Sequence, residues 1–146
     1  MKLFLDTSSL FKLYYQEVDS SDMEKIFINQ DVTTVFLSAL TIIEFSSTLW
    51  RKVRMQELSD HLAQSLISFF EDDFSKFTFV PIDSIVIEHA QTLLTKYGKQ
   101  GLRTLDSLQL ATAVLLKGKG DVFFTADALL KSFFIQEALP IEVAGK

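Results

Sequence analysis

The sequence has 146 residues, no cysteine and a formal net charge of −5, and 48% of its residues are hydrophobic. This length and composition suit one domain with one core, which we expect to span residues 1–146. Without cysteine there is no disulfide, thiolate metal site or cysteine nucleophile, and we expect the protein in the cytoplasm. The negative charge disfavours nucleic-acid binding through a broad basic surface, because phosphate neutralisation dominates such affinity.

The first apolar segment covers residues 3–5 and stops at Asp6. It is far shorter than a signal-peptide core or the roughly 20 residues that span a bilayer, so we expect no membrane association. The mean hydropathy is nevertheless high for a soluble protein. We therefore expect a partner chain, in an oligomer or a regulatory complex, to cover part of the apolar surface.

The predicted elements begin with a short buried strand over residues 2–5. The cap-rich segment 6–9 then leads into a helix that runs to about residue 16. A short helix is expected over residues 22–27, and the β-branched and aromatic content of residues 33–37 predicts a second strand. The amino-terminal part therefore contains two strands that are linked through helical segments.

Apolar residues at three- and four-residue spacing then predict helices over residues 39–55 and 58–70, which we expect to form a helical hairpin. Gly and Pro positions bound the later elements, and the loop over residues 98–101 is a candidate flexible segment. These later elements are a strand over 77–82, helices over 85–97 and 104–117, a strand over 121–125, a helix over 126–136 and a last strand around 141. Alternating strands and helices predict the α/β class, with a parallel sheet whose ligand site lies at the carboxyl ends of the strands.

Four acidic residues, Asp6, Glu44, Asp106 and Asp127, are candidate site residues. Each one alone also has a structural explanation. Asp6 can be a helix N-cap, and Glu44 can be a charge at the edge of an apolar helix face. Asp106 and Asp127 can be acids that the helix dipole favours in a first turn.

Considered together, the four acids indicate a metal site. Three of them occur at predicted helix starts, and two of those follow strands that should be neighbours in the sheet. Carboxylates about 4 Å apart repel by roughly 4 kcal/mol per pair at an effective dielectric near 20, so a cluster requires protons or cations. Oxygen donors favour Mg²⁺ or Mn²⁺ over zinc. No catalytic role is expected for the two histidines, His61 and His89.

Each of the four acids lies in a short motif. The motifs are LFLDTSS at residues 3–9, TIIEF at 41–45, RTLDSLQLATA at 103–113 and FFTAD at 123–127. In this order they resemble the motifs of the PIN-domain nucleases, and among them the small VapC-type toxins of toxin–antitoxin systems. The resemblance covers nearly the whole chain. Each motif is weak alone, and their order and spacing make the set specific.

The resemblance implies a three-layer α/β/α PIN-like domain with a central parallel sheet and a protruding helical hairpin. It implies that the four acids hold one or two Mg²⁺ or Mn²⁺ ions, with the Thr7, Ser8 and Thr125 hydroxyls orienting these ligands. Arg103 either contacts a phosphate or pairs with a neighbouring carboxylate. Both alternatives are open from the sequence.

The same resemblance implies a metal-dependent ribonuclease that hydrolyses RNA phosphodiesters and acts as the toxin of a toxin–antitoxin pair, inhibiting translation or growth. It further implies a homodimer and a small VapB-like antitoxin as partners. The alternative is a non-catalytic PIN-fold scaffold that binds RNA or protein. Phosphatases of the haloacid-dehalogenase type are disfavoured, because they need an acid where this chain has Ser8.

Overall fold

Four parallel strands form the centre of the computed structural model, which describes residues 1–15, 25, 27 and 31–142. They are β1 (Lys2–Leu5), β2 (Thr34–Ser38), β3 (Thr78–Val80) and β4 (Val122–Phe124). The order across the sheet is β3-β2-β1-β4, and Phe4 of β1 is in register with Phe36 of β2 and Phe123 of β4. Because the strands are parallel, their carboxyl ends meet at one edge of the sheet.

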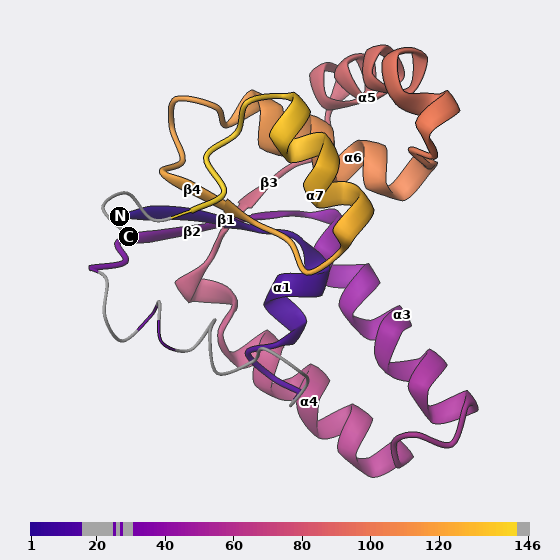
Figure 1. Cartoon of the computed structure of the whole chain (residues 1–146). Coiled ribbons are helices and arrows are strands. Elements are labelled where there is room, and N and C mark those ends of the chain that lie inside the picture. Colours follow the sequence, from indigo (N-terminus) through magenta and orange to yellow (C-terminus); the bar gives the residue numbers. More distant parts are fainter. Residues whose placement is uncertain (16–24, 26, 28–30, 143–146) are drawn as a thin grey trace.

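Helices cover both faces of the sheet, which confirms the predicted three-layer α/β/α architecture (Figure 1). One layer contains α5, α6 and α7, and the other contains α1, α3 and α4. The helices are α1 (Thr7–Phe11), α3 (Leu40–Arg54), α4 (Asp60–Asp72), α5 (Ser84–Tyr97), α6 (Thr104–Leu115) and α7 (Ala128–Gln136), with short 3-10 turns η1 (Phe74–Lys76) and η2 (Gly98–Gln100). As expected, α3 and α4 form a hairpin that projects beyond the sheet (Figure 1).

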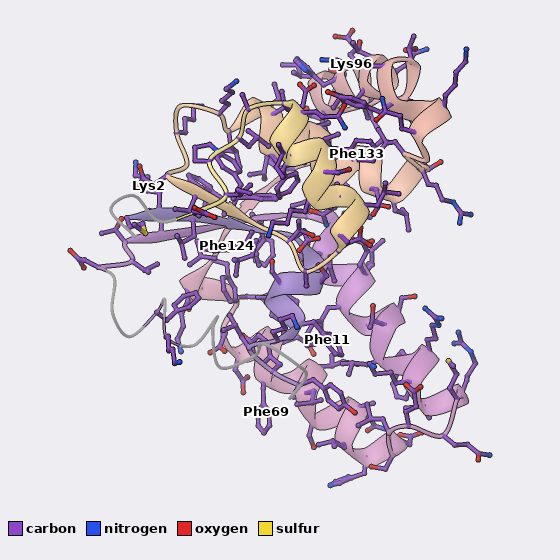
Figure 2. All side chains as sticks on the ribbon, viewed as in Figure 1. Lys2, Phe11, Phe69, Lys96, Phe124 and Phe133 are labelled. Carbon is purple, nitrogen blue, oxygen red and sulfur yellow. The ribbon has the colours of Figure 1, made fainter. Side chains whose placement is uncertain are left out.

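Two apolar cores lie on opposite faces of the sheet. Phe4 and Phe123 pack into the core beneath α5, α6 and α7, where Figure 2 shows Phe133. Leu5 belongs to the second core, which contains Phe11 on the opposite side of the sheet (Figure 2). Successive strand residues point to opposite faces, so a parallel strand covered on both sides must be apolar throughout, as β1 is after its first residue.

The first helix is shorter than predicted. It ends at Phe11 and not near residue 16, and the chain continues in turns through residue 15. The Leu13 and Tyr14 amides donate to carbonyls three residues back, at 2.9 and 3.1 Å. The Tyr14 hydroxyl donates to Asp73 Oδ2 at 2.6 Å, at the end of α4. Packing against α4, which the local sequence does not encode, accompanies this departure from the helix.

The predicted strand around residue 141 is wrong for the described residues, since no strand follows β4 up to residue 142. The Phe123 amide donates to the Pro140 carbonyl at 2.8 Å, but Pro140 has no N–H with which to extend a ladder. Most of the helix predicted over residues 22–27 lies outside the described residues. In the described ranges, no helix is long and apolar enough to cross a membrane.

Candidate functional site

A pocket of about 450 Å³ opens at the carboxyl edge of the sheet. All four predicted acids line it, although they come from four different parts of the chain. The lining residues are Asp6, Thr7, Ser8, Phe11, Lys12, Glu44, Thr48, Lys52, Asp106, Gln109, Ala126 and Asp127. The ends of two strands and the helices α3 and α6 therefore bring the four predicted acids to one pocket.

Asp6 follows β1 and caps α1, where its Oδ1 accepts a hydrogen bond from the Ser9 amide at 2.9 Å. The Ser9 hydroxyl also donates to Oδ1 at 2.9 Å, and the Thr125 hydroxyl donates to Oδ2 at 2.5 Å. Only 4% of Asp6 is exposed, and burial raises its pKa to about 6 even though these hydrogen bonds act in the opposite direction. The N-cap role and a site role are therefore compatible in one carboxylate.

The ends of β1 and β4 are joined by hydroxyl groups. Ser8 Oγ donates to both Asp6 oxygens, at 2.8 and 2.9 Å, and accepts from the Ala126 amide at 2.9 Å. Thr125 Oγ1 accepts from the Asp127 amide at 3.1 Å. Asp127 is exposed and caps α7, accepting from a backbone amide of that helix through Oδ1. Two adjacent strand ends thus fix Asp6 and Asp127 relative to each other.

Glu44 lies on α3, one turn after Thr41, and belongs to a network of polar groups. Its Oε1 accepts from the Thr7 hydroxyl at 2.8 Å and from Gln109 Nε2 at 2.8 Å. Gln109 Nε2 also lies 3.0 Å from Thr41 Oγ1. The first strand-to-helix turn and α6 together determine where this carboxylate lies.

Asp106 is half-buried in the first turn of α6. Burial raises its pKa, and the negative charges of Asp127 and Glu44 raise it further, whereas Arg103 lowers it. The Arg103 side chain lines a neighbouring depression that Glu44 and Asp106 share, and it forms no ion pair within 4.0 Å with any described residue. The charges of two acids therefore oppose ionisation of Asp106, and the charge of Arg103 favours it.

The chemistry of the donor set fits a hard divalent cation, because the pocket offers carboxylate, hydroxyl and amide oxygens and neither histidine lines it. Among the described residues, however, no three acidic or histidine side chains converge closely enough to form a ready-made metal cage. The carboxylates surround the pocket without closing on one point. Like-charge repulsion, which raises the pKa of Asp106, opposes closer approach.

Sequence reasoning did not identify three polar residues that line the pocket, Lys12, Thr48 and Lys52. It also missed three polar residues of the hydrogen-bond network around the acids, namely Ser9, Thr41 and Gln109. All three are buried. Spacing carried a signal for two of them, because Thr41 lies three residues before Glu44 and Gln109 lies three residues after Asp106. Residues three apart share a helix face, so a polar residue at that distance from a site acid on an apolar helix is a candidate neighbour.

The fold and the site together define a class of protein, a three-layer α/β/α domain with an acidic pocket at the carboxyl edge of its sheet. A family model described as the PIN domain matches residues 3–133, which is most of the chain. The chain belongs to the PIN-domain family. A comparison with curated proteins gave no match.

Solved structures with the same fold include Mycobacterium tuberculosis VapC20, a toxin that cleaves the sarcin–ricin loop. Its TM-score is 0.67 at 13% identity, over 90% of this chain and 94% of VapC20. A chain of Rickettsia felis VapBC2, a complex bound to a promoter DNA fragment, has a TM-score of 0.65 at 16% identity, over 97% and 98% of the two chains. DNA-bound VapBC from Salmonella typhimurium gives 0.59 at 15% identity, over 97% of each chain.

Proposed function

We propose that the protein is a metal-dependent ribonuclease and the toxin of a toxin–antitoxin pair that inhibits translation or growth. The observation that carries the proposal is the pocket in which Asp6, Glu44, Asp106 and Asp127 meet. PIN-family membership and the likeness to VapC20, a toxin that cleaves the sarcin–ricin loop, support RNA as the substrate.

The four acids are the proposed ligands of one or two Mg²⁺ or Mn²⁺ ions. When bound, such an ion activates water for attack on phosphorus and neutralises charge on the phosphoryl oxygens. Thr7, Ser8 and Thr125 hold Glu44 and Asp6 in place through their hydroxyl hydrogen bonds. Arg103 lies beside the pocket, where it reduces the unfavourable charge around Asp106.

The pocket also contains basic side chains, which favour a phosphate-bearing substrate. Lys12 and Lys52 line it together with Phe11. Lys52 Nζ lies 5.7 Å from the centre of the Phe11 ring and 3.6 Å from Glu57 Oε2, contacts that direct its ammonium group. A negatively charged protein can bind RNA locally when the cations lie beside the acids that hold the metal.

The test is cleavage of mixed cellular RNA by purified, partner-free protein with Mg²⁺, Mn²⁺ or EDTA. We expect discrete metal-dependent products that disappear in Asp6→Asn and Asp106→Asn. Asp72→Asn is the matched control, since it makes the same change at an exposed position outside the pocket. Folded wild-type protein that cleaves nothing in either metal would favour the non-catalytic scaffold.

A VapB-like antitoxin and a second copy of the chain are the proposed protein partners. The VapBC complexes among the similar structures support the first. Apolar side chains remain exposed in the single chain, such as Phe69, which is 55% exposed and projects from α4 (Figure 2), and Ile85 and Ile87 on α5. Light scattering after size-exclusion chromatography, with and without co-expressed antitoxin, tests both assemblies. A monomer at all concentrations would contradict the homodimer.

A further inference from the structure

Gln109 is a buried polar residue whose position is tied to the pocket. It lies one turn after Asp106 on α6 and is 2% exposed. Its Nε2 lies 2.8 Å from Glu44 Oε1, 3.0 Å from Thr41 Oγ1 and 3.2 Å from Thr7 Oγ1. The amide nitrogen therefore faces three oxygens from two other helices.

The other end of the amide has no such partners. Gln109 Oε1 is buried and forms no hydrogen bond with any described residue. A buried acceptor without a partner costs about 1–3 kcal/mol, so this arrangement is not explained by stability. Reversing the amide would place its oxygen against the Glu44 carboxylate, where two acceptors repel. The Glu44 carboxylate thus determines the orientation of the Gln109 amide, and this orientation leaves Gln109 Oε1 without a hydrogen bond among the described residues.

Both donors to Glu44 bind the same carboxylate oxygen. Thr7 Oγ1 and Gln109 Nε2 each lie 2.8 Å from Oε1. Among the described residues no hydrogen bond is recorded for Oε2, and Glu44 lines the pocket. A glutamate has three rotatable side-chain bonds, so two donors on one oxygen restrict its rotamer and leave the other oxygen available.

We propose that Gln109 is a positioning residue that, with Thr7, holds Glu44 Oε1 so that Oε2 binds the divalent cation. This inference rests on the proposed metal-dependent function of the same pocket. Hydrogen-bond partners of metal ligands typically contribute 10- to 100-fold in metal affinity or activity. The role of Gln109 is then to position Glu44, and its unpaired Oε1 lowers the stability of the folded protein.

The test uses the full chain, stripped of metal, with Gln109→Met, which keeps the side-chain length and removes the donor. Thr112→Val is the matched control. Thr112 is also buried on α6, and among the described residues its hydroxyl binds only the Leu108 carbonyl of its own helix, at 2.8 Å. Mn²⁺ affinity is measured by calorimetry, and the free energy of unfolding is measured in EDTA. We expect Gln109→Met to bind Mn²⁺ on the order of 10- to 100-fold more weakly than Thr112→Val, without being less stable.

Equal Mn²⁺ affinities of the Gln109→Met and Thr112→Val variants would overturn the inference. If Gln109→Met does not fold, Gln109→Asn replaces it, since that variant keeps the amide but is too short to reach Glu44. The same measurements distinguish failure of the positioning role from failure of the proposed ribonuclease function. Wild-type protein that binds Mn²⁺ but cleaves no RNA contradicts the ribonuclease, while a weaker-binding Gln109 variant still supports the positioning role. Wild-type protein that binds no Mn²⁺ contradicts both.

Discussion

The Thr125 hydroxyl donates a hydrogen bond of 2.5 Å to Asp6 Oδ2, and this bond connects the residues that follow β4 and β1. It is the hydrogen bond that most lowers the pKa of Asp6, against the larger opposing effect of burial. The acidity of Asp6 therefore depends on a residue 119 positions away in the sequence. Two predictions concern this pair.

The stability of the metal-free protein should fall as the pH rises through about 6. Folding raises the pKa of Asp6 from 3.8 to about 6, so the folded state binds a proton that the unfolded state releases. The bound proton stabilises the folded state fully below pH 3.8, and this contribution is lost as the pH rises from 3.8 to about 6. At 1.36 kcal/mol per pKa unit, the free energy of unfolding falls by about 3 kcal/mol over this range. Urea unfolding in EDTA at several pH values measures it. Asp6→Asn should lack this component, and parallel curves for the two proteins would contradict the prediction.

Thr125→Val should move the onset of Mn²⁺ binding to higher pH. The substitution removes the donor to Asp6, so the pKa of that carboxyl rises further and a metal must compete with a more tightly held proton. Calorimetric titrations with Mn²⁺ between pH 5 and 8 measure the shift. Thr112→Val makes the same chemical change outside the pocket and should leave the profile of the wild-type protein unaltered. A Thr125→Val profile identical to the control would disprove the coupling.

Lys52→Gln should weaken RNA binding more than it slows cleavage. Lys52 lines the same pocket as the four acids, so losing its charge should raise KM several-fold and lower the salt slope of binding by about 1. Steady-state cleavage kinetics at several salt concentrations test this. Lys119→Gln, at an exposed position outside the pocket, is the control. If the two variants have the same KM and salt slope, Lys52 does not contact the substrate.

Gly98, which begins η2, and Gly101, which follows it, should respond differently to alanine. Gly101 has φ of +105°, and an added Cβ would lie 3.3 Å from Leu129 Cδ2, so Gly101→Ala should lower the free energy of unfolding by about 1 kcal/mol or more. Gly98 has φ of −54° and open space around it, so Gly98→Ala should be neutral or slightly stabilising. Urea denaturation of both variants measures the difference. Equal effects would show that the left-handed turn before α6 is not required.

Much of the fold is predictable from local patterns. Apolar strands, helix periodicity and cap residues predict β1, β2, α3, α4 and α5 to within a few residues, because these signals depend on neighbours in the chain. The local pattern fails where distant contacts intervene. The helix expected to reach residue 16 ends at Phe11, and Tyr14 beyond it binds Asp73, the residue after α4. Pro140 accepts one hydrogen bond from β4 and forms no strand.

The candidate site divides in the same way. The sequence by itself predicted the four acids as site residues from the order of the motifs, and predicted that Asp6 and Asp127 lie close together because residues after adjacent parallel strands meet at one edge of the sheet. Only the tertiary structure decided the geometry around them: the burial that raises the pKa of Asp6, the absence of a ready-made cage among the described residues, and the contact of Gln109 with Glu44. The physical reason is that burial and hydrogen bonding depend on groups far apart in the chain, whereas capping and periodicity depend on near neighbours.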